Sequence, residues 1–335
     1  MENLAIIESF GEFKDEKSID RVTLMTFIEE AFRVQIRKKY LTDDNFDVIV
    51  NPDKGDLEIW RNRTIVADGA LEDENLEIAL SEAIKIEPDF EVGEEVSEEI
   101  KIIDLGRRFI LAFRQTLVQK VQEHDSGELF KRYKTMEGEI ISGEVHHVRH
   151  REMIIYDDQQ NELILRREDM IPEKDFYRKG DTVRAIVMLV EVRGVKPFIL
   201  LSRTSEAFLA KLFEAEIPEV FDGIITVKNV VRIPGEKAKV AVESYDDRID
   251  PVGACVGMKG SRIHSIVREL RGENIDVINY TSNLQLMIQR ALSPAKITNM
   301  VLDEERRHAN VYLPADQVSL AIGRGGGNIR LASKL

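Results

Sequence analysis

Two glycine-containing segments near the end of the 335-residue chain have the residue types needed to hold a nucleic-acid backbone. The first reads Gly-Met-Lys-Gly at residues 257–260, and the second reads Gly-Arg-Gly-Gly at residues 323–326. Glycine removes the side chain that would keep a sugar-phosphate backbone at a distance, and it permits a positive φ where a turn requires one. A helix that follows such a turn presents free N–H groups and its positive dipole end to a phosphate.

Basic residues lie inside both segments and shortly after them. Neither segment ends in the Gly-Lys-Ser/Thr of a P-loop. The second departs from the dinucleotide pattern Gly-x-Gly-x-x-Gly at Asn328, so both kinds of nucleotide-binding loop are rejected. The residues expected to contact RNA are Gly257, Met258, Lys259, Gly260, Arg262, Gly323, Arg324, Gly325, Gly326 and Arg330.

The two segments belong to an internal repeat with a spacing of 66 residues. Residues 252–260 align with residues 318–326, and Ile263 aligns with Ile329. In each copy a strand-like run precedes the loop and helix-forming sequence follows it, although the second copy stops within that helix. A single Gly-x-x-Gly is often only a turn that ends a helix. Two in equivalent positions of a repeat, each with a basic residue, resemble the KH domain, whose loop clamps about four nucleotides.

Residues 136–203 contain short strand-like runs separated by turn residues. The expected strands cover residues 139–149, 152–156, 162–165, 182–192 and 197–201. Five strands in so short a segment fit an OB-type barrel. The opening Met-Glu-Gly and the closing Leu-Ser-Arg resemble the S1 motif. A short linking helix is expected over residues 205–216.

Four side chains of this barrel are candidates for stacking on RNA bases, as aromatic residues do on OB surfaces. They are His147, Tyr156, Phe176 and Tyr177. For Tyr156 and Phe176, a place in the barrel core is an alternative of at least equal weight.

The first 134 residues mix helix and strand. An apolar stripe that includes Leu24, Ile28, Phe32 and Ile36 predicts a helix of about 20 residues. Apolar residues alternate on both sides of residues 52–55, which predicts a hairpin.

The remainder of this segment is expected to be a loop followed by a long helix. The acidic stretch 87–99 has few apolar residues and is expected to be a loop. From residue 105 to about residue 133, Ile110, Phe113, Leu117 and Val121 fall on one face of a helix that leads into the barrel.

The net charge of −14 is distributed unevenly along the chain. Residues 1–134 carry −12, residues 135–221 carry −5 and residues 222–335 carry +3. Because only the region with the two loops is basic, we expect different partners for different segments.

No residue pattern indicates catalysis or a metal site. His146 and His147 are adjacent in an expected strand and should point to opposite faces, so they should not bind one metal together. Cys255 lies in an apolar run and is expected to pack rather than react. We therefore expect neither an enzyme nor a cofactor.

Several features indicate a cytoplasmic protein. There is one cysteine, so no internal disulfide forms, and no apolar run approaches the roughly 18 residues of a membrane span. The amino terminus lacks the basic start and apolar stretch of a signal peptide.

The chain as a whole resembles the NusA family of bacterial transcription factors. Residues 250–263 are similar to the first KH domain of that family, and residues 321–333 are similar to its second. The order of acidic amino-terminal domain, S1-type barrel and tandem KH domains also agrees. One departure is Gly327, where a larger polar residue is usual.

The resemblance implies a multidomain α+β protein with a mixed α/β amino-terminal domain, a five-stranded OB-fold barrel and two type II KH domains. The expected domains are an RNA-polymerase-binding domain (1–134), the barrel (135–204), a first KH domain with its linking helix (205–290) and a truncated second KH domain (291–335).

The resemblance also implies a function. A NusA-type protein binds RNA polymerase and nascent single-stranded RNA and modulates elongation, pausing, termination and antitermination. Other antitermination factors are further expected partners, and the chain is expected to be a monomer. The alternative is an RNA-binding accessory module of an RNA-degrading or ribosome-associated complex.

Overall fold

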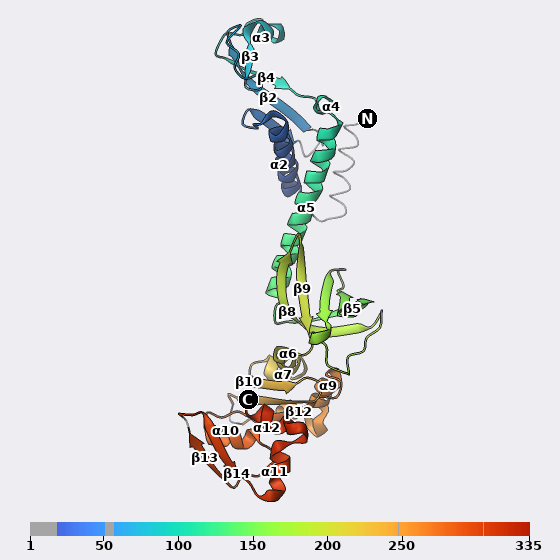
Figure 1. Cartoon of the computed structure of the whole chain (residues 1–335), viewed down its shortest axis with the longest axis vertical. Coiled ribbons are helices and arrows are strands. Elements are labelled where there is room, and N and C mark those ends of the chain that lie inside the picture. The colour runs from blue at the N-terminus through green and yellow to red at the C-terminus, as the bar shows by residue number, and fades with distance from the viewer. Residues whose placement is uncertain (1–18, 51–56, 247, 304) are drawn as a thin grey trace. The chain divides into compact units, whose positions relative to one another are not determined.

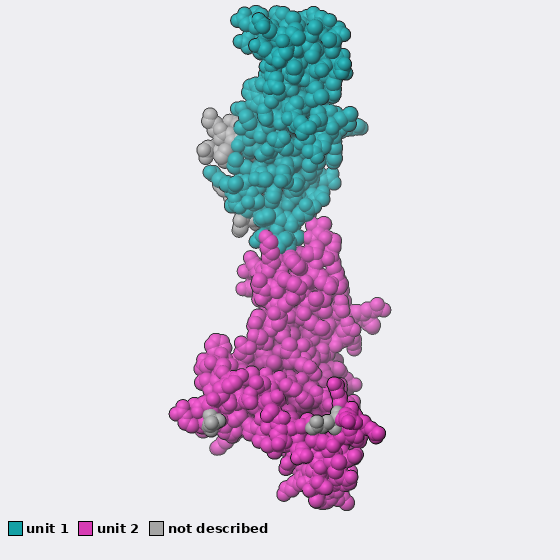
Figure 2. Space-filling model, turned by 90° about the vertical axis from the view of Figure 1, so that its left-hand side faces the viewer, with its two compact units in different colours: residues 1–128 teal, residues 129–335 magenta. Residues whose placement is uncertain are grey.

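A computed structural model describes residues 19–335, except residues 51–56, 247 and 304 (Figure 1). The chain divides into two compact units, residues 1–128 and residues 129–335 (Figure 2). The expected hairpin turn at residues 52–55 and the start of the chain, where no signal peptide was expected, lie outside the described residues. Among the described residues, no helix is long and apolar enough to cross a membrane.

The first unit contains two helices that pack through their apolar faces. Helix α2 (Arg21–Tyr40) begins at Asp20, whose side chain accepts a hydrogen bond from the N–H of Thr23 at 2.9 Å. Its four predicted core residues are all buried, and Phe32 stacks on Phe113 of helix α5 (Arg107–Thr135) with ring centroids 4.0 Å apart. Both predicted helices are therefore confirmed. A short helix α4 (Ile102–Leu105) precedes α5, and the two are separated by Gly106 at φ +86°.

The sheet of the first unit is built around strand β2. Its elements are β1 (Phe46–Val50), β2 (Leu57–Val66), β3 (Glu77–Ala79), helix α3 (Leu80–Ile86) and β4 (Glu95–Glu99). Strands β1 and β4 pair antiparallel with β2, and β3 pairs parallel with it. The predicted hairpin strands are confirmed.

The prediction of a loop over residues 87–99 is wrong for its last five residues, which form β4. Val96 is fully buried, and Glu98 lies 3.0 Å from Arg61 and 2.6 Å from Arg63 on the neighbouring strand. The acidic composition suggested a solvated segment, but cross-strand cations balance the charge of Glu98 and one apolar side chain anchors the strand.

The second unit begins with a closed five-stranded barrel in the order β5-β6-β7-β9-β8. Its elements are β5 (Ile140–Val148), β6 (Glu152–Tyr156), β7 (Glu162–Arg166), a 3-10 turn η1 (Arg167–Asp169), β8 (Thr182–Arg193) and β9 (Lys196–Ser202). All five predicted strands are confirmed. The end of α5 also packs here, because Tyr133 is buried in the barrel core.

The prediction that His146 and His147 point to opposite faces is wrong. The pairing of β5 with β6 shifts between Val145 and His147, so His146 is the extra residue of a bulge. A bulge interrupts the alternation of side chains along a strand. The imidazole rings of His146 and His147 lie close to each other, with ring centroids 5.6 Å apart.

The first repeat copy folds as a three-stranded sheet covered by helices. Its elements are α6 (Glu206–Glu216), α7 (Pro218–Phe221), β10 (Ile225–Ile233), β11 (Lys237–Ser244), α8 (Pro251–Val256), η2 (Met258–Gly260), α9 (Ser261–Glu269) and β12 (Asn274–Asn279). Strand β11 pairs antiparallel with β10 and parallel with β12. The predicted linking helix α6 is also a core element, since Phe208, Leu209 and Phe213 are fully buried.

The second copy repeats this order over a shorter stretch. Its elements are α10 (Leu284–Ala291), β13 (Asn299–Asp303), β14 (His308–Tyr312), α11 (Ala315–Ile322), η3 (Arg324–Gly326) and α12 (Gly327–Ala332). Strands β13 and β14 form an antiparallel pair. The expected multidomain α+β fold, with a closed five-stranded barrel followed by two copies of the repeated unit, is confirmed.

Candidate nucleic-acid interface

The two glycine loops have the same backbone conformation. Gly257 has φ +74° and ψ 172°, and Gly323 has φ +72° and ψ 173°. Lys259 and Gly325 both adopt the left-handed conformation, with φ of +53° and +56°. Gly260 and Gly326 follow at φ +77° and +72°. The 66-residue repeat in the sequence is therefore also a repeat of backbone geometry at the first, third and fourth loop positions.

The first glycine of each loop is required by its neighbours as well as by its φ. A Cβ atom on Gly323 would lie 2.7 Å from the Cβ of Asn328 and 2.9 Å from its backbone nitrogen. A Cβ on Gly257 would lie 2.9 Å from the Cγ of Arg262. Each loop is thus packed tightly against the first turn of the helix that follows it.

The tips of the loops are open to solvent. Met258 is 89% exposed, and Lys259 and Arg324 are also exposed. Neither of these two basic side chains forms an ion pair with any described residue. Their charges are therefore available to a phosphate, as the sequence suggested.

Arg262, in contrast, is engaged within the protein. Its guanidinium Nη1 lies 2.7 Å from Oε2 of Glu219 on α7 and donates to the carbonyl oxygen of Ala254 at 2.8 Å. Partial burial acts to raise the pKa of Glu219, but its own backbone N–H and the Arg262 guanidinium hold it below its ordinary value. Arg262 therefore ties the loop to α8 and α7.

The second loop is tied in the same place by a neutral residue. The 66-residue spacing places Asn328 opposite Arg262 and Leu320 opposite Ala254. Asn328 is buried, and its side-chain amide donates to the carbonyl oxygens of Leu320 at 3.3 Å and Ala321 at 3.1 Å. Arg262 and Asn328 both donate to backbone carbonyl oxygens of the helix before their loop, the first from a charged side chain and the second from a neutral one.

Glu219 and Asn328 were both missed by the sequence analysis as parts of the site. The signal for Asn328 was present, since strict use of the repeat spacing aligns Arg262 with Asn328 and His264 with Arg330. Arg330 is exposed and donates from Nη2 to the carbonyl oxygen of Gly325 at 2.9 Å. No sequence pattern pointed to Glu219.

The two KH copies share a packed interface. Ala241 and Ile278 of the first copy form one apolar cluster with Ala291 of α10 and Ala332 of α12. Lys237 of the first copy donates to the side-chain oxygen of Asn328 at 3.3 Å. Asn328 thus connects its own loop with the neighbouring domain.

The barrel holds the four stacking candidates in two separate places. His147 is exposed on β5, and half-buried Tyr156 on β6 stacks on His146 at 4.5 Å. Phe176, which is 77% exposed, and half-buried Tyr177 lie instead on the segment between η1 and β8. The alternative that Phe176 belongs to the barrel core is wrong.

Comparison with known proteins identifies the family. The NusA N-terminal domain family matches residues 5–126, the NusA-like first KH domain family matches residues 203–280, and the NusA-like second KH domain family matches residues 284–335. The transcription termination/antitermination protein NusA of Thermus thermophilus is 34% identical over 340 residues, with 97% of this chain and 87% of the relative covered. The chain belongs to the NusA family.

Two further NusA proteins give the same result. The Rickettsia conorii NusA is 35% identical, and the match covers 99% of this chain and 66% of that protein. The Bacillus subtilis NusA is 32% identical, and the match covers 98% of this chain and 88% of that protein.

Gly327, the position at which the sequence comparison led us to expect a larger polar residue, has room for a Cβ atom. Gly327 is buried at the start of α12, and a Cβ there would lie 3.9 Å from the Cδ1 of Ile233. This distance is an ordinary van der Waals contact. The glycine is therefore not required at this position by a close approach of Ile233.

The cysteine of this NusA-family chain lies in the interior of the protein. Cys255 is fully buried, and burial raises the pKa of its thiol to about 12. Its expected packing role is confirmed. The part of the chain that the structure describes contains no group of three or more histidine, cysteine or acidic side chains arranged to hold a metal ion.

Proposed function

We propose that the chain is a cytoplasmic transcription termination and antitermination factor that acts by binding. In this proposal the two KH loops hold nascent single-stranded RNA, and the amino-terminal domain binds RNA polymerase. The observation that carries it is the pair of loops with matching dihedrals and exposed Lys259 and Arg324. The relatives are named transcription termination/antitermination proteins, and we infer that RNA binding serves the same processes in this chain.

The proposed RNA contacts are the residues of the two loops together with Arg330. Backbone N–H groups after each loop would bind phosphates, and bases would lie against the neighbouring apolar surface. Arg262 is assigned a positioning role, since Glu219 already balances its charge. The division into domains 1–134, 135–204, 205–290 and 291–335, the monomeric state and binding to other antitermination factors are part of the same proposal.

The charge of the amino-terminal domain supports a protein partner for it. Residues 67–99 contain thirteen acidic residues and one basic residue, a net charge of −12. This segment would repel RNA and would attract a basic protein surface, mainly by raising the association rate at low salt.

The first test removes the RNA contacts. Met258→Asp with Lys259→Asp, and separately Arg324→Asp, place negative charge where phosphate would lie. Each variant should bind single-stranded RNA more weakly with an unchanged melting temperature, because these side chains are exposed. RNA affinity that is unaltered in both folded variants would overturn the KH assignment.

The second test separates the two units. Fragment 1–128 should retain purified RNA polymerase and ignore RNA, and fragment 129–335 should bind RNA. The cut is placed after residue 128 because Leu129, Phe130 and Tyr133 pack in the barrel core. If fragment 129–335 retained polymerase and fragment 1–128 did not, the proposed division of labour would be wrong.

Membership in the NusA family favours this transcription role over an accessory module of an RNA-degrading or ribosome-associated complex. The polymerase experiment also separates these two candidates, because such a module has no reason to bind polymerase.

A further inference from the structure

The ring of His264 packs against the first glycine loop. Helix α9 begins at Ser261, so His264 lies in its first turn. The imidazole Nδ1 lies 2.5 Å from the carbonyl oxygen of Gly260, and a Cβ atom on Gly260 would lie 2.7 Å from the same nitrogen. The ring therefore covers the last glycine of the loop, where the proposed function places an RNA phosphate. His264 is exposed, so a bound RNA can reach the free edge of its ring.

The hydrogen bond of Nδ1 determines what the other ring nitrogen of His264 can do. A carbonyl oxygen only accepts hydrogen bonds, so Nδ1 carries a proton and donates to Gly260. In the neutral imidazole Nε2 is then an acceptor, and its lone pair repels a phosphate oxygen. Protonation turns Nε2 into a donor and gives the ring a positive charge. The same side chain thus changes from an unfavourable to a favourable neighbour of a phosphate.

The internal repeat contains a charged counterpart of His264. The 66-residue spacing aligns His264 with Arg330, which is exposed and donates from Nη2 to the carbonyl oxygen of Gly325 at 2.9 Å. Both side chains therefore donate to a carbonyl oxygen of their own loop. A guanidinium is always charged in proteins, whereas the charge of histidine ordinarily changes between about pH 5 and 8. The second loop has a permanent cation where the first has a titratable one.

The charged groups around His264 leave a protonated ring without a carboxylate partner from the protein. Lys259 in the loop and Arg268, one turn later on α9, are exposed cations that form no ion pair with any described residue. Carboxylates on α9 and on the elements around it are paired with other cations: Glu219 of α7 with Arg262, Glu216 of α6 with Arg184, Glu214 of α6 with Lys211, Asp276 of β12 with Lys239, and Glu269 of α9 with Arg203. Asp250 accepts hydrogen bonds at the start of α8. A phosphate at the loop is therefore the anion that a protonated His264 can meet.

We propose that His264 is a further RNA contact of the first loop, and that this contact forms only when the imidazole is protonated. The Nε2–H group then donates to a phosphate oxygen, so that RNA binding and proton uptake are linked. The affinity of the first loop for RNA rises as the pH falls from about 8 to about 5, and by the same linkage a bound RNA draws a proton from solution. The proposal rests on the RNA-binding function proposed above, and it gives a pH dependence to one of the two loops.

The test uses the full chain with Arg324→Asp, which disables the second loop, and an oligouridine of about four nucleotides, the length that one KH loop holds. Uridine with hydroxyl ends is chosen because neither its base nor its ends change charge in this pH range. Calorimetric titration should show affinity about two- to fivefold higher at about pH 5.5 than at about pH 8, the effect of one exposed charge pair. The slope of log K against log salt should be steeper by about 0.7 at the lower pH.

Proton uptake gives a second readout that a purely structural role of the ring would not change. Titrations near pH 6.5 in buffers of different ionisation enthalpy should show that a fraction of a proton is taken up for each RNA bound. The ion pair between Glu219 and Arg262 does not contribute, because the pKa of Glu219 lies below its ordinary value and the pair is intact at these pH values.

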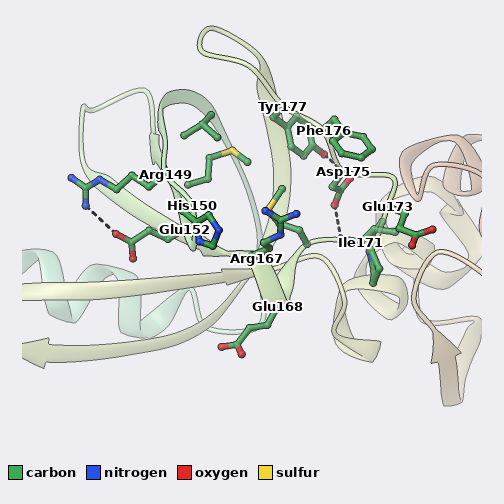
Figure 3. A pocket seen from close by; sticks show the side chains of 14 residues that line it. Arg149, His150, Glu152, Arg167, Glu168, Ile171, Glu173, Asp175, Phe176 and Tyr177 are labelled. Carbon is green, nitrogen blue, oxygen red and sulfur yellow. Dashed lines mark hydrogen bonds and ion pairs between the residues drawn. The ribbon is translucent and has the colours of Figure 1, made fainter.

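Substitutions assign the proton to His264. His264→Gln keeps a donor for Gly260 but cannot become charged, so its affinity should equal that of the unsubstituted residue at about pH 8 and should not change with pH. His264→Arg gives the first loop the residue of the second and should bind tightly at both pH values. His150→Gln is the matched control, because His150 is also exposed and lines a pocket of the barrel whose walls include no residue of either loop (Figure 3). It should keep the full pH dependence.

Each result decides a separate question. A pH-independent affinity in the chain with Arg324→Asp would overturn the role of His264 while leaving the KH loops in place. A pH dependence that persists in His264→Gln would also overturn it, since another group would then take up the proton. Affinity lost equally at both pH values in His264→Gln would assign the ring to support of the loop alone. If the loop variants bound RNA normally, the proposed function would fail whatever His264 did.

Discussion

The role of Arg262 can be separated from that of Lys259 by the salt dependence of RNA binding. Each contact of a cation with a single-strand phosphate adds about −0.7 to the slope of log K against log salt. Four basic residues near the loops would give a slope of about −3 if all of them met phosphates. Because Glu219 neutralises Arg262, we expect three such contacts, from Lys259, Arg324 and Arg330, and a slope of about −2.

Substitution separates the two roles further. Lys259→Gln should lower the affinity and make the slope shallower by about 0.7. Arg262→Gln should lower the affinity without changing the slope, since it removes only the tie between Glu219, Ala254 and the loop. The Arg262–Glu219 pair is partly exposed, so we expect a loss of about 0.5–1 kcal/mol, or about two- to fivefold in affinity.

The assay is a titration of oligoadenosine by fluorescence anisotropy at several salt concentrations. Asn328→Ala is the matched control, because it removes the neutral tie of the second loop and should also leave the slope unchanged. A change of slope of about 0.7 in Arg262→Gln, equal to that in Lys259→Gln, would refute the assignment of Arg262 as a positioning residue.

Three further outcomes follow from buried or paired groups. The thiol of Cys255 should react with an aromatic disulfide reagent only on unfolding, because it is buried and its pKa is raised to about 12; rapid reaction of the native protein at neutral pH would contradict this. The hydrogen bond from Arg37 lowers the pKa of Asp43 in the folded protein. The stabilisation from this pair is therefore present above pH 3.8 and is lost as the pH falls through the lowered pKa of the folded state. Asp43→Asn should destabilise fragment 1–128 at pH 7 and have little effect near pH 2, as measured by urea unfolding. Arg203→Met should destabilise the second unit by about 3–5 kcal/mol, because it leaves the buried Asp175 carboxylate with only the more distant Arg271, at 3.8 Å, as a cation. Arg203→Met with Asp175→Asn should recover much of that loss in the same denaturant assay.

Much of the fold could be predicted from apolar periodicity. Leu24, Ile28, Phe32 and Ile36 recur at helical spacing, and the barrel strands alternate over lengths that are bounded by turns. These patterns are local, and the burial that they imply is the dominant stabilising term. The loops could be found for a different reason, since glycine at fixed positions of a repeat reports a backbone conformation that other residues rarely adopt.

The features that escaped the sequence analysis depend on neighbours that are distant along the chain. Strand β4 pairs with β2, whose Arg61 and Arg63 lie more than thirty residues earlier and balance Glu98. The bulge at His146 is a property of the pairing between two strands and has no signature within one of them. Glu219 contacts Arg262 across 43 residues, so the role of Arg262 could not be deduced from its place after the loop.

An ion pair holds the first loop and an uncharged amide holds the second, so the two loops should respond differently to pH and salt. Protonation of Glu219 would break its ion pair with Arg262 and leave only the hydrogen bond from Arg262 to Ala254, and concentrated salt would weaken the same ion pair. The amide of Asn328 has no charge to titrate or screen, and it is buried. Because the pKa of Glu219 lies below its ordinary value of 4.5, only acid well below pH 4.5 should weaken RNA binding at the first loop while the second loop still binds, so that a transcript would dissociate in two stages rather than one.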